Sequence, residues 1–185
     1  WVDIDSLRPD HLGCYGYPNA TTPVLDAFAK ESVIYDHAYT TAGVCAPCRS
    51  AIITGMYQTS IGSHHMRCKA IPPEHVKPFT FWLTKAGYYR TNNSKQDYQF
   101  DTPRGTWDES SSNAHWKNCP TDKPFFSVFN YTGCHESGIA SESKYKKVID
   151  GLEQHDRDVV AQSLPPYYPD TPVARDDWGR YYDVI

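Results

Sequence analysis

The chain has 185 residues, of which 39% are hydrophobic and 14% aromatic, and its formal net charge is −4. This length and composition favour a packed core and one domain, and they argue against a disordered chain. The negative charge gives no overall attraction for nucleic acid, and no apolar run approaches the roughly 20 residues that a membrane span needs.

The first half of the chain is predicted to alternate between strands and helices. Thr22 followed by Pro23 is typical of a helix start, and Pro47 and Gly55 are typical of the start and end of a short helix. The expected elements are a strand at 1–5, a helix at 23–32, a short strand at 33–39 and a helix at 47–54.

The second half continues the alternation. The apolar run at 124–132, bounded by Pro124 and Gly133, suits a central strand that is covered on both faces. The other expected elements are a helix at 78–87, a strand at 88–93 and a helix from about Val173, whereas 101–123 and 140–158 are polar and read as turns and surface. This order predicts an α/β fold with a largely parallel central sheet flanked by helices, and with its chemistry in the loops that follow the strands.

The segment VCAPCRSAIITG (44–55) has several interpretations. Cys45 and Cys48 with a proline between them, at a helix start, suit a thioredoxin-like redox pair. Together with His64 or His65 and Cys68 they also have finger-like zinc spacing. The six cysteines are irregularly spaced, so mostly free thiols are expected, and two buried free cysteines are a further interpretation.

A fourth interpretation uses more of the segment. Cys45 lies just before the expected helix, where unpaired N–H groups favour an anion, and Arg49 is expected to project back toward it. This arrangement suits a nucleophile that attacks an anionic group.

Cys-x-Pro-x-Arg followed by Thr54-Gly55 resembles the sulfatase signature, in which the cysteine is oxidised to formylglycine. The chain departs from that pattern at Cys48, where the family usually has serine. Resemblance to the heparan N-sulfatase (N-sulfoglucosamine sulfohydrolase)-like branch extends over nearly the whole chain, through DSLRPDHLGCYGY, FTFWLTKAGYYRTNNSKQDYQF, KPFFSVFNYTGCHES and LPPYYPDTPVARDDWGRYYDVI. It implies an alkaline phosphatase-like fold and an incomplete catalytic domain, with 1–185 as an N-terminal part truncated at both ends.

The resemblance also implies roles for single residues. Cys45 as formylglycine would be the nucleophile, and the residues that hold the sulfuryl group or move protons would be Arg49, Lys95 and His135. A calcium ion would be bound by Asp5 and Cys45, with Ser6 as a weak ligand in place of a second aspartate.

Two further features concern the substrate side. Many sulfatases have Lys-x-His after this strand, whereas this chain has Lys95-Gln-Asp97, so the histidine's role is expected to be filled elsewhere or omitted. The basic stretch SHHMRCK (63–69) has two interpretations. It is either the basic edge of a binding site for a sulfated or carboxylated sugar, with His65 and Arg67 in contact with the sugar, or an ordinary charged loop.

The implied function is hydrolysis of sulfate esters or sulfamates on a sugar, with glycosaminoglycan glucosamine as one candidate. The alternatives are a phosphonate or phosphate-ester hydrolase of the same superfamily, and a redox or zinc module. The expected partners are a sulfated saccharide and a formylglycine-generating enzyme, with no nucleic acid and no membrane span. The expected compartment is periplasmic, secreted or lysosomal, and the fragment alone is expected to be inactive.

Overall fold

The computed structural model describes all of residues 1–185 and groups them into two compact units. Unit 1 consists of Trp1–Asp3 and His37–Asn130, and unit 2 of Ile4–Asp36 and Tyr131–Ile185. The strands are β1 (Val2–Ile4), β2 (Tyr89–Asn93), β3 (Glu109–Ser110) and β4 (Phe125–Tyr131). The α-helices are α1 (Pro23–Ala29), α2 (Cys45–Thr54), α3 (Phe79–Lys85), α4 (Glu136–Ala140), α5 (Glu142–Val148), α6 (Arg157–Ala161) and α7 (Pro172–Asp183).

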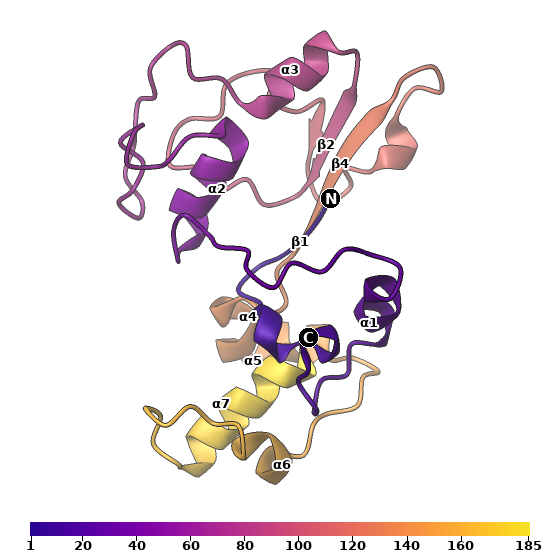
Figure 1. Cartoon of the computed structure of the whole chain (residues 1–185), viewed down its shortest axis with the longest axis vertical. Coiled ribbons are helices and arrows are strands. Elements are labelled where there is room, and N and C mark those ends of the chain that lie inside the picture. Colours follow the sequence, from indigo (N-terminus) through magenta and orange to yellow (C-terminus); the bar gives the residue numbers. More distant parts are fainter. The chain divides into compact units, whose positions relative to one another are not determined.

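The four strands form one sheet in the order β1-β4-β2-β3. Strand β2 runs parallel to β4, with Tyr89 opposite Phe125 and Asn93 opposite Phe129, and Figure 1 shows the two strands side by side. It is also parallel to β3 on its other edge, where Thr91 lies opposite Glu109. The predicted α/β class with a parallel sheet flanked by helices is therefore confirmed.

Strand β2 is buried although its central residues are polar. Thr91 donates a hydrogen bond to Ser127 Oγ at 2.7 Å. Arg90, only 4% exposed, forms a two-pronged ion pair with Asp108, with both N–O distances 2.9 Å, and donates to the carbonyl of Gly105 at 2.7 Å. Because a buried charge is costly unless it is paired and hydrogen-bonded, Asp108 is what allows Arg90 to lie inside.

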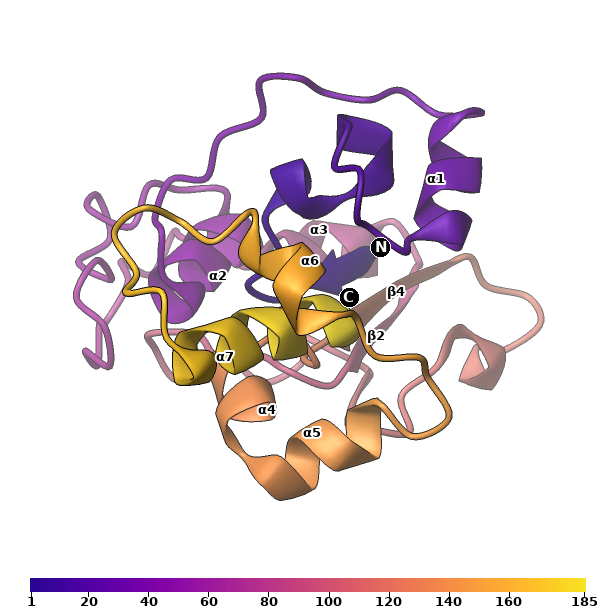
Figure 2. The same cartoon turned by 90° about the horizontal axis from the view of Figure 1, so that it is seen from below.

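Unit 2 is built around α7, which packs beside α6, as Figure 2 also shows. Thr171 caps the helix by accepting from the amide of Ala174 at 3.3 Å, and the buried Asp183 lies in its last turn. Asp183 accepts hydrogen bonds from Tyr145 Oη at 2.5 Å and from Arg157 at 2.8 Å, so one carboxylate links α5, α6 and α7.

Several sequence-based predictions of elements were wrong. Residues 33–39 form no strand, because Val33, Tyr35 and Tyr39 are exposed and the segment pairs with no neighbour. The polar stretch 101–123 contains β3, and helices occur in and beside 140–158, where only polar surface was expected. No helix in the structure is both long enough and apolar enough to cross a bilayer.

Candidate active site

Helix α2 places Cys45 at its first residue. The preceding residue, Val44, is extended and makes no side-chain cap, so the first-turn amides receive no capping side chain. The prediction that Pro47 starts the helix was wrong by two residues, since Pro47 lies within the first turn. Gly55 ends the helix at φ 65°, in the left-handed conformation that glycine adopts without strain, as predicted.

The loop after β2 reaches this helix start. Gln99 in that loop donates its backbone N–H to Ser50 Oγ at 2.9 Å, and Ser50 in turn donates to the carbonyl of Ala46 at 2.8 Å. Both Gln99 and Ser50 are buried. The loop is therefore fastened to the first two turns of α2, next to Cys45.

Gln99 also holds the basic stretch 63–69. Its side-chain amide donates to the carbonyl of His65 and accepts from the backbone N–H of Arg67 at 3.0 Å, while its own main-chain carbonyl accepts from the amide of Ala70 at 2.8 Å. One buried residue thus joins three segments: α2, the loop after β2 and the basic stretch.

These connections bring Asp97 against Cys45. The carboxylate of Asp97 lies within hydrogen-bonding reach of the Cys45 thiol, 2.5 Å from the guanidinium of Arg67 and 3.6 Å from Lys95 Nζ. Burial works to raise the pKa of Asp97, but the contacts with Cys45, Arg67 and Lys95 outweigh it and hold the pKa below its usual value. Asp97 is therefore a carboxylate near neutral pH.

The same surroundings suppress ionisation of Cys45. Burial raises the pKa of the Cys45 thiol, and the Asp97 carboxylate acts in the same direction against a smaller opposing effect of Lys95. A thioredoxin-like site requires the opposite, a lowered pKa at the first cysteine. Cys45 and Cys48 are both free thiols, and the raised pKa of Cys45 disfavours the redox interpretation.

The zinc interpretation was also wrong. No group of three or more His, Cys, Asp or Glu side chains in the chain is placed to hold a metal ion. The prediction of mostly free thiols is confirmed, since all six cysteines are unpaired.

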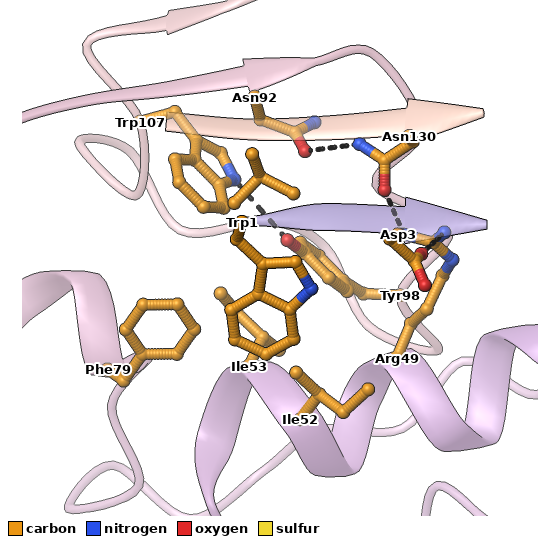
Figure 3. A pocket seen from close by; sticks show the side chains of 11 residues that line it. Trp1, Asp3, Arg49, Ile52, Ile53, Phe79, Asn92, Tyr98, Trp107 and Asn130 are labelled. Atoms are coloured by element: carbon orange, nitrogen blue, oxygen red, sulfur yellow. Dashed lines mark hydrogen bonds and ion pairs between the residues drawn. The ribbon is translucent and has the colours of Figure 1, made fainter. Parts of the chain in front are cut away.

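Arg49 is held by side chains from two strands, as Figure 3 shows. Its guanidinium forms an ion pair with Asp3 of β1 and donates to Asn130 Oδ1 at 2.9 Å. It also donates to the carbonyl of Lys95 at 3.2 Å. Asn130 donates in turn to Asn92 Oδ1 at 2.9 Å, so the guanidinium is fixed relative to the sheet and to the loop that carries Lys95.

Arg49 is one of the residues that line a cavity of about 40 Å³ (Figure 3). Its lining is largely apolar and includes Trp1, Phe79 and Trp107, with Trp1 and Phe79 stacked at a centroid distance of 6.4 Å. The cavity has room for very few water molecules and is far smaller than the several hundred Å³ of ordinary ligand pockets. It is therefore not a sugar site.

The two residues predicted to bind the sugar, His65 and Arg67, make different contacts. The rings of His65 and His64 lie against each other at 4.3 Å, and it is the carbonyl of His65 that contacts Gln99. Arg67 has an exposed side chain, 68% accessible, although its end contacts Asp97. Unit 1 thus brings Arg67, Lys95 and Cys45 together around Asp97, a residue to which the sequence assigned no role.

The remaining predicted residues belong to unit 2. Asp5 follows β1, is buried, and donates its backbone N–H to the carbonyl of Tyr131 at 2.9 Å, and Ser6 next to it has a left-handed backbone with φ 62°. His135 caps α4, and its Nδ1 accepts from the amide of Ser137 at 3.2 Å. In the neutral ring with this tautomer, the Nε2–H is left able to donate a hydrogen bond.

The calcium site predicted from Asp5, Ser6 and Cys45 stays a prediction, because Asp5 and Ser6 belong to unit 2 and Cys45 to unit 1. A calcium ion takes six to eight oxygen ligands, and no cluster of acidic side chains is present in the chain.

Comparison with known proteins decides the family. The sulfatase family model matches residues 1–160. The chain belongs to the sulfatase family. A curated relative described as an ulvan-active sulfatase, from Formosa agariphila, is 41% identical over 97% of the chain, which spans 37% of that relative's length. Human N-sulphoglucosamine sulphohydrolase is 23% identical over 94% of the chain, which spans 41% of its length, so the resemblance to that branch is real but distant.

Solved sulfatase-like structures confirm the fold. A structure in complex with D-glucosamine-2-N,6-O-disulfate has a TM-score of 0.66 at 16% identity, covering 92% of this chain and 38% of that one. A phosphonate monoester hydrolase of Agrobacterium radiobacter also has a TM-score of 0.66 at 14% identity, covering 99% of this chain and 55% of that one. The chain thus has part of a fold that sulfatases and phosphonate hydrolases share.

Proposed function

We propose that this sulfatase chain forms part of an active site that hydrolyses sulfate esters or sulfamates on a sugar, with Cys45 converted to formylglycine. The observation that carries the proposal is the placement of Cys45. It lies at the uncapped start of α2, beside Lys95, Arg67 and Asp97, within a chain whose family match spans this whole region. The hydrated aldehyde of formylglycine would supply the attacking hydroxyl.

The cationic residues of unit 1 have distinct roles in this proposal. Arg49 is fixed by Asp3 and Asn130 and would offset charge on the sulfuryl oxygens without having to reorganise. Lys95, whose Nζ lies 3.6 Å from the Asp97 carboxylate, would bind the sulfate group. Arg67, whose side chain is the most exposed of the three, would contact an anionic group elsewhere on the sugar.

His135 would contact the sulfate group or the leaving oxygen or nitrogen of the sugar. Its Nδ1 accepts from the amide of Ser137, so in the neutral ring the Nε2–H can donate a hydrogen bond to that group. Asp5 would contribute one carboxylate to a calcium site, with residue 45 as a further ligand and Ser6 as a weak one. The proposed partners are a sulfated saccharide, of which glycosaminoglycan glucosamine is one candidate, and a formylglycine-generating enzyme, in a periplasmic, secreted or lysosomal setting.

Peptide mass spectrometry tests the proposal directly. In the protein that carries this chain, produced with a formylglycine-generating enzyme, the peptide with Cys45 should be about 18 Da lighter than its unmodified form. A sulfated aryl ester should be hydrolysed, and Cys45→Ala should abolish the activity. An active protein with unmodified Cys45 would refute the mechanism, and faster hydrolysis of an aryl phosphonate monoester would favour the phosphonate alternative.

The 185-residue chain alone should show no sulfatase activity, since its residues form no complete metal cluster. Activity of the isolated chain equal to that of the longer protein would contradict this expectation.

A further inference from the structure

The Asp97 carboxylate contains an unsatisfied atom at the centre of the proposed site. Its Oδ1 receives the guanidinium of Arg67 at 2.5 Å, whereas its Oδ2 is buried and accepts no hydrogen bond of normal geometry. Lys95 Nζ lies 3.6 Å from Oδ2, which is an ion-pair distance rather than a hydrogen bond. Buried carboxylate oxygens normally receive a donor, so this atom is expected to have a partner that the unmodified chain does not supply.

The side chain next to Asp97 is that of Cys45, which the proposed function converts to formylglycine. The Cys45 thiol lies within reach of the carboxylate, but S–H is a weak hydrogen-bond donor. A hydroxyl at the same position is a strong donor, and a hydroxyl paired with a carboxylate forms a short, charge-assisted bond. Conversion of residue 45 from a thiol to a hydrated aldehyde would therefore supply the missing donor.

The backbone supports a role that is specific to this position. Asp97 has φ 52° and its partner Arg67 has φ 62°, both in the left-handed region that non-glycine residues seldom occupy. Gln99 fixes both segments by contacts with the backbone around Arg67 and with Ser50 of α2. Strained backbone held in place by buried contacts is common at functional positions, because the surrounding structure must compensate for its cost.

We propose that Asp97 is a catalytic residue that accepts a hydrogen bond from one hydroxyl of hydrated formylglycine at position 45. This inference rests on the proposed function. Holding one hydroxyl favours the hydrate over the free aldehyde and leaves the other hydroxyl as the one that faces the substrate. It assigns to a carboxylate the place where many sulfatases have histidine.

The first test measures the aldehyde rather than the reaction. An aminooxy probe condenses with free aldehyde to form an oxime and water, so its rate reports the fraction of residue 45 that is not hydrated. In Asp97→Ala, oxime formation per formylglycine should be about 10-fold faster than in the unchanged protein, since the hydrate loses a charge-assisted hydrogen bond. Asp97→Asn keeps an acceptor oxygen and should show a smaller increase.

The second test separates kcat from KM on a sulfated aryl ester, with rates expressed per formylglycine as measured by peptide mass. In Asp97→Ala, kcat should fall about 10- to 100-fold. The KM should stay level or fall, because Arg67 and Lys95 lose a competing anion. Asp101→Ala is the matched control. Asp101 is an exposed aspartate four residues further along the chain, so this substitution should leave kcat and KM unchanged.

The outcomes distinguish the alternatives. Unchanged oxime formation and unchanged kcat in Asp97→Ala would overturn the inference, as would a rise in KM alone, which a purely structural role for Asp97 would produce. If Asp97→Ala reduces conversion of Cys45, Asp97→Asn and normalisation to formylglycine still decide the question. Absence of formylglycine from the unchanged protein would instead refute the proposed function itself.

Discussion

The buried Arg90–Asp108 pair anchors the strand that leads to the site, and replacing Asp108 should destabilise the protein. The Asp108→Ala change leaves the Arg90 charge, 4% exposed, with only neutral acceptors such as the carbonyl of Gly105. Removing one partner of a buried ion pair typically costs about 3 to 5 kcal/mol. Asp108 is about one-third exposed, so the cost should lie at the lower end, at about 3 kcal/mol.

Urea unfolding followed by tryptophan fluorescence measures this cost. With a denaturant slope of about 2 kcal/mol per M, the midpoint should fall by about 1.5 M. The exposed Asp122 provides the control, and Asp122→Ala should shift the midpoint by less than about 0.3 M. A shift of the same small size for Asp108→Ala would refute the argument that the pair supports β2.

The same pair predicts a pH dependence. Burial tends to raise the pKa of Asp108, but Arg90 outweighs it and lowers the pKa below the ordinary value of 3.8. A lowered pKa in the folded state means that the stabilisation is complete above pH 3.8 and is lost as the pH falls toward the folded-state pKa. The stability difference between the unchanged protein and Asp108→Asn should therefore be constant at neutral pH and shrink below pH 3.8. A difference that instead grows on acidification would contradict the sign of this effect.

Three further predictions concern the site. Arg49→Lys removes the simultaneous contacts of the guanidinium with Asp3 and Asn130, so it should lower kcat on a sulfated aryl ester by at least about 10-fold. A decrease in kcat of less than about twofold would show that these contacts are not needed. In protein without formylglycine, burial and the Asp97 carboxylate raise the pKa of Cys45, so Asp97→Asn should speed its alkylation by iodoacetamide at about pH 8. Peptide mapping measures the rate, and an unchanged rate in Asp97→Asn would contradict the prediction. Gln99→Ala removes the buried hydrogen bonds to His65 and Arg67, so it should lower the free energy of unfolding by about 2 kcal/mol and raise KM. An unchanged melting temperature would show that other contacts hold these loops.

The sequence predicted the elements whose signals are local and strong. The helix that carries Cys45 was identified from Pro47 and Gly55, and the central strand from its apolar run, and both are present. The start of the helix was misplaced because a proline is tolerated anywhere in the first turn, so it marks the turn and not the first residue. The strand predicted at 33–39 failed because a β-rich pattern needs a partner strand, and that requirement is not visible in the segment itself.

The candidate site was predicted in part. The family resemblance identified Cys45, Arg49 and Lys95, and the structure shows that Arg49 contacts the carbonyl of Lys95. It could not show that Asp97 contacts Cys45, because that contact depends on a left-handed residue and on the buried Gln99, neither of which has a sequence signature. The sequence signal that pointed to Asp97 was its own identity, because many sulfatases have histidine at this position after the lysine.

The contacts of Gln99 with the basic stretch have a consequence for how the specificity of such enzymes can diverge. Its side chain binds only main-chain atoms there, the carbonyl of His65 and the N–H of Arg67. These two contacts therefore do not depend on the side chains of His64 and His65, although Arg67 also contacts Asp97 through its side chain. Under the proposed function, substitutions at His64 or His65 are expected to alter the surface that meets the sugar without removing these two contacts. Substrate preference would then change by single mutations while the proposed chemistry at residue 45 is kept.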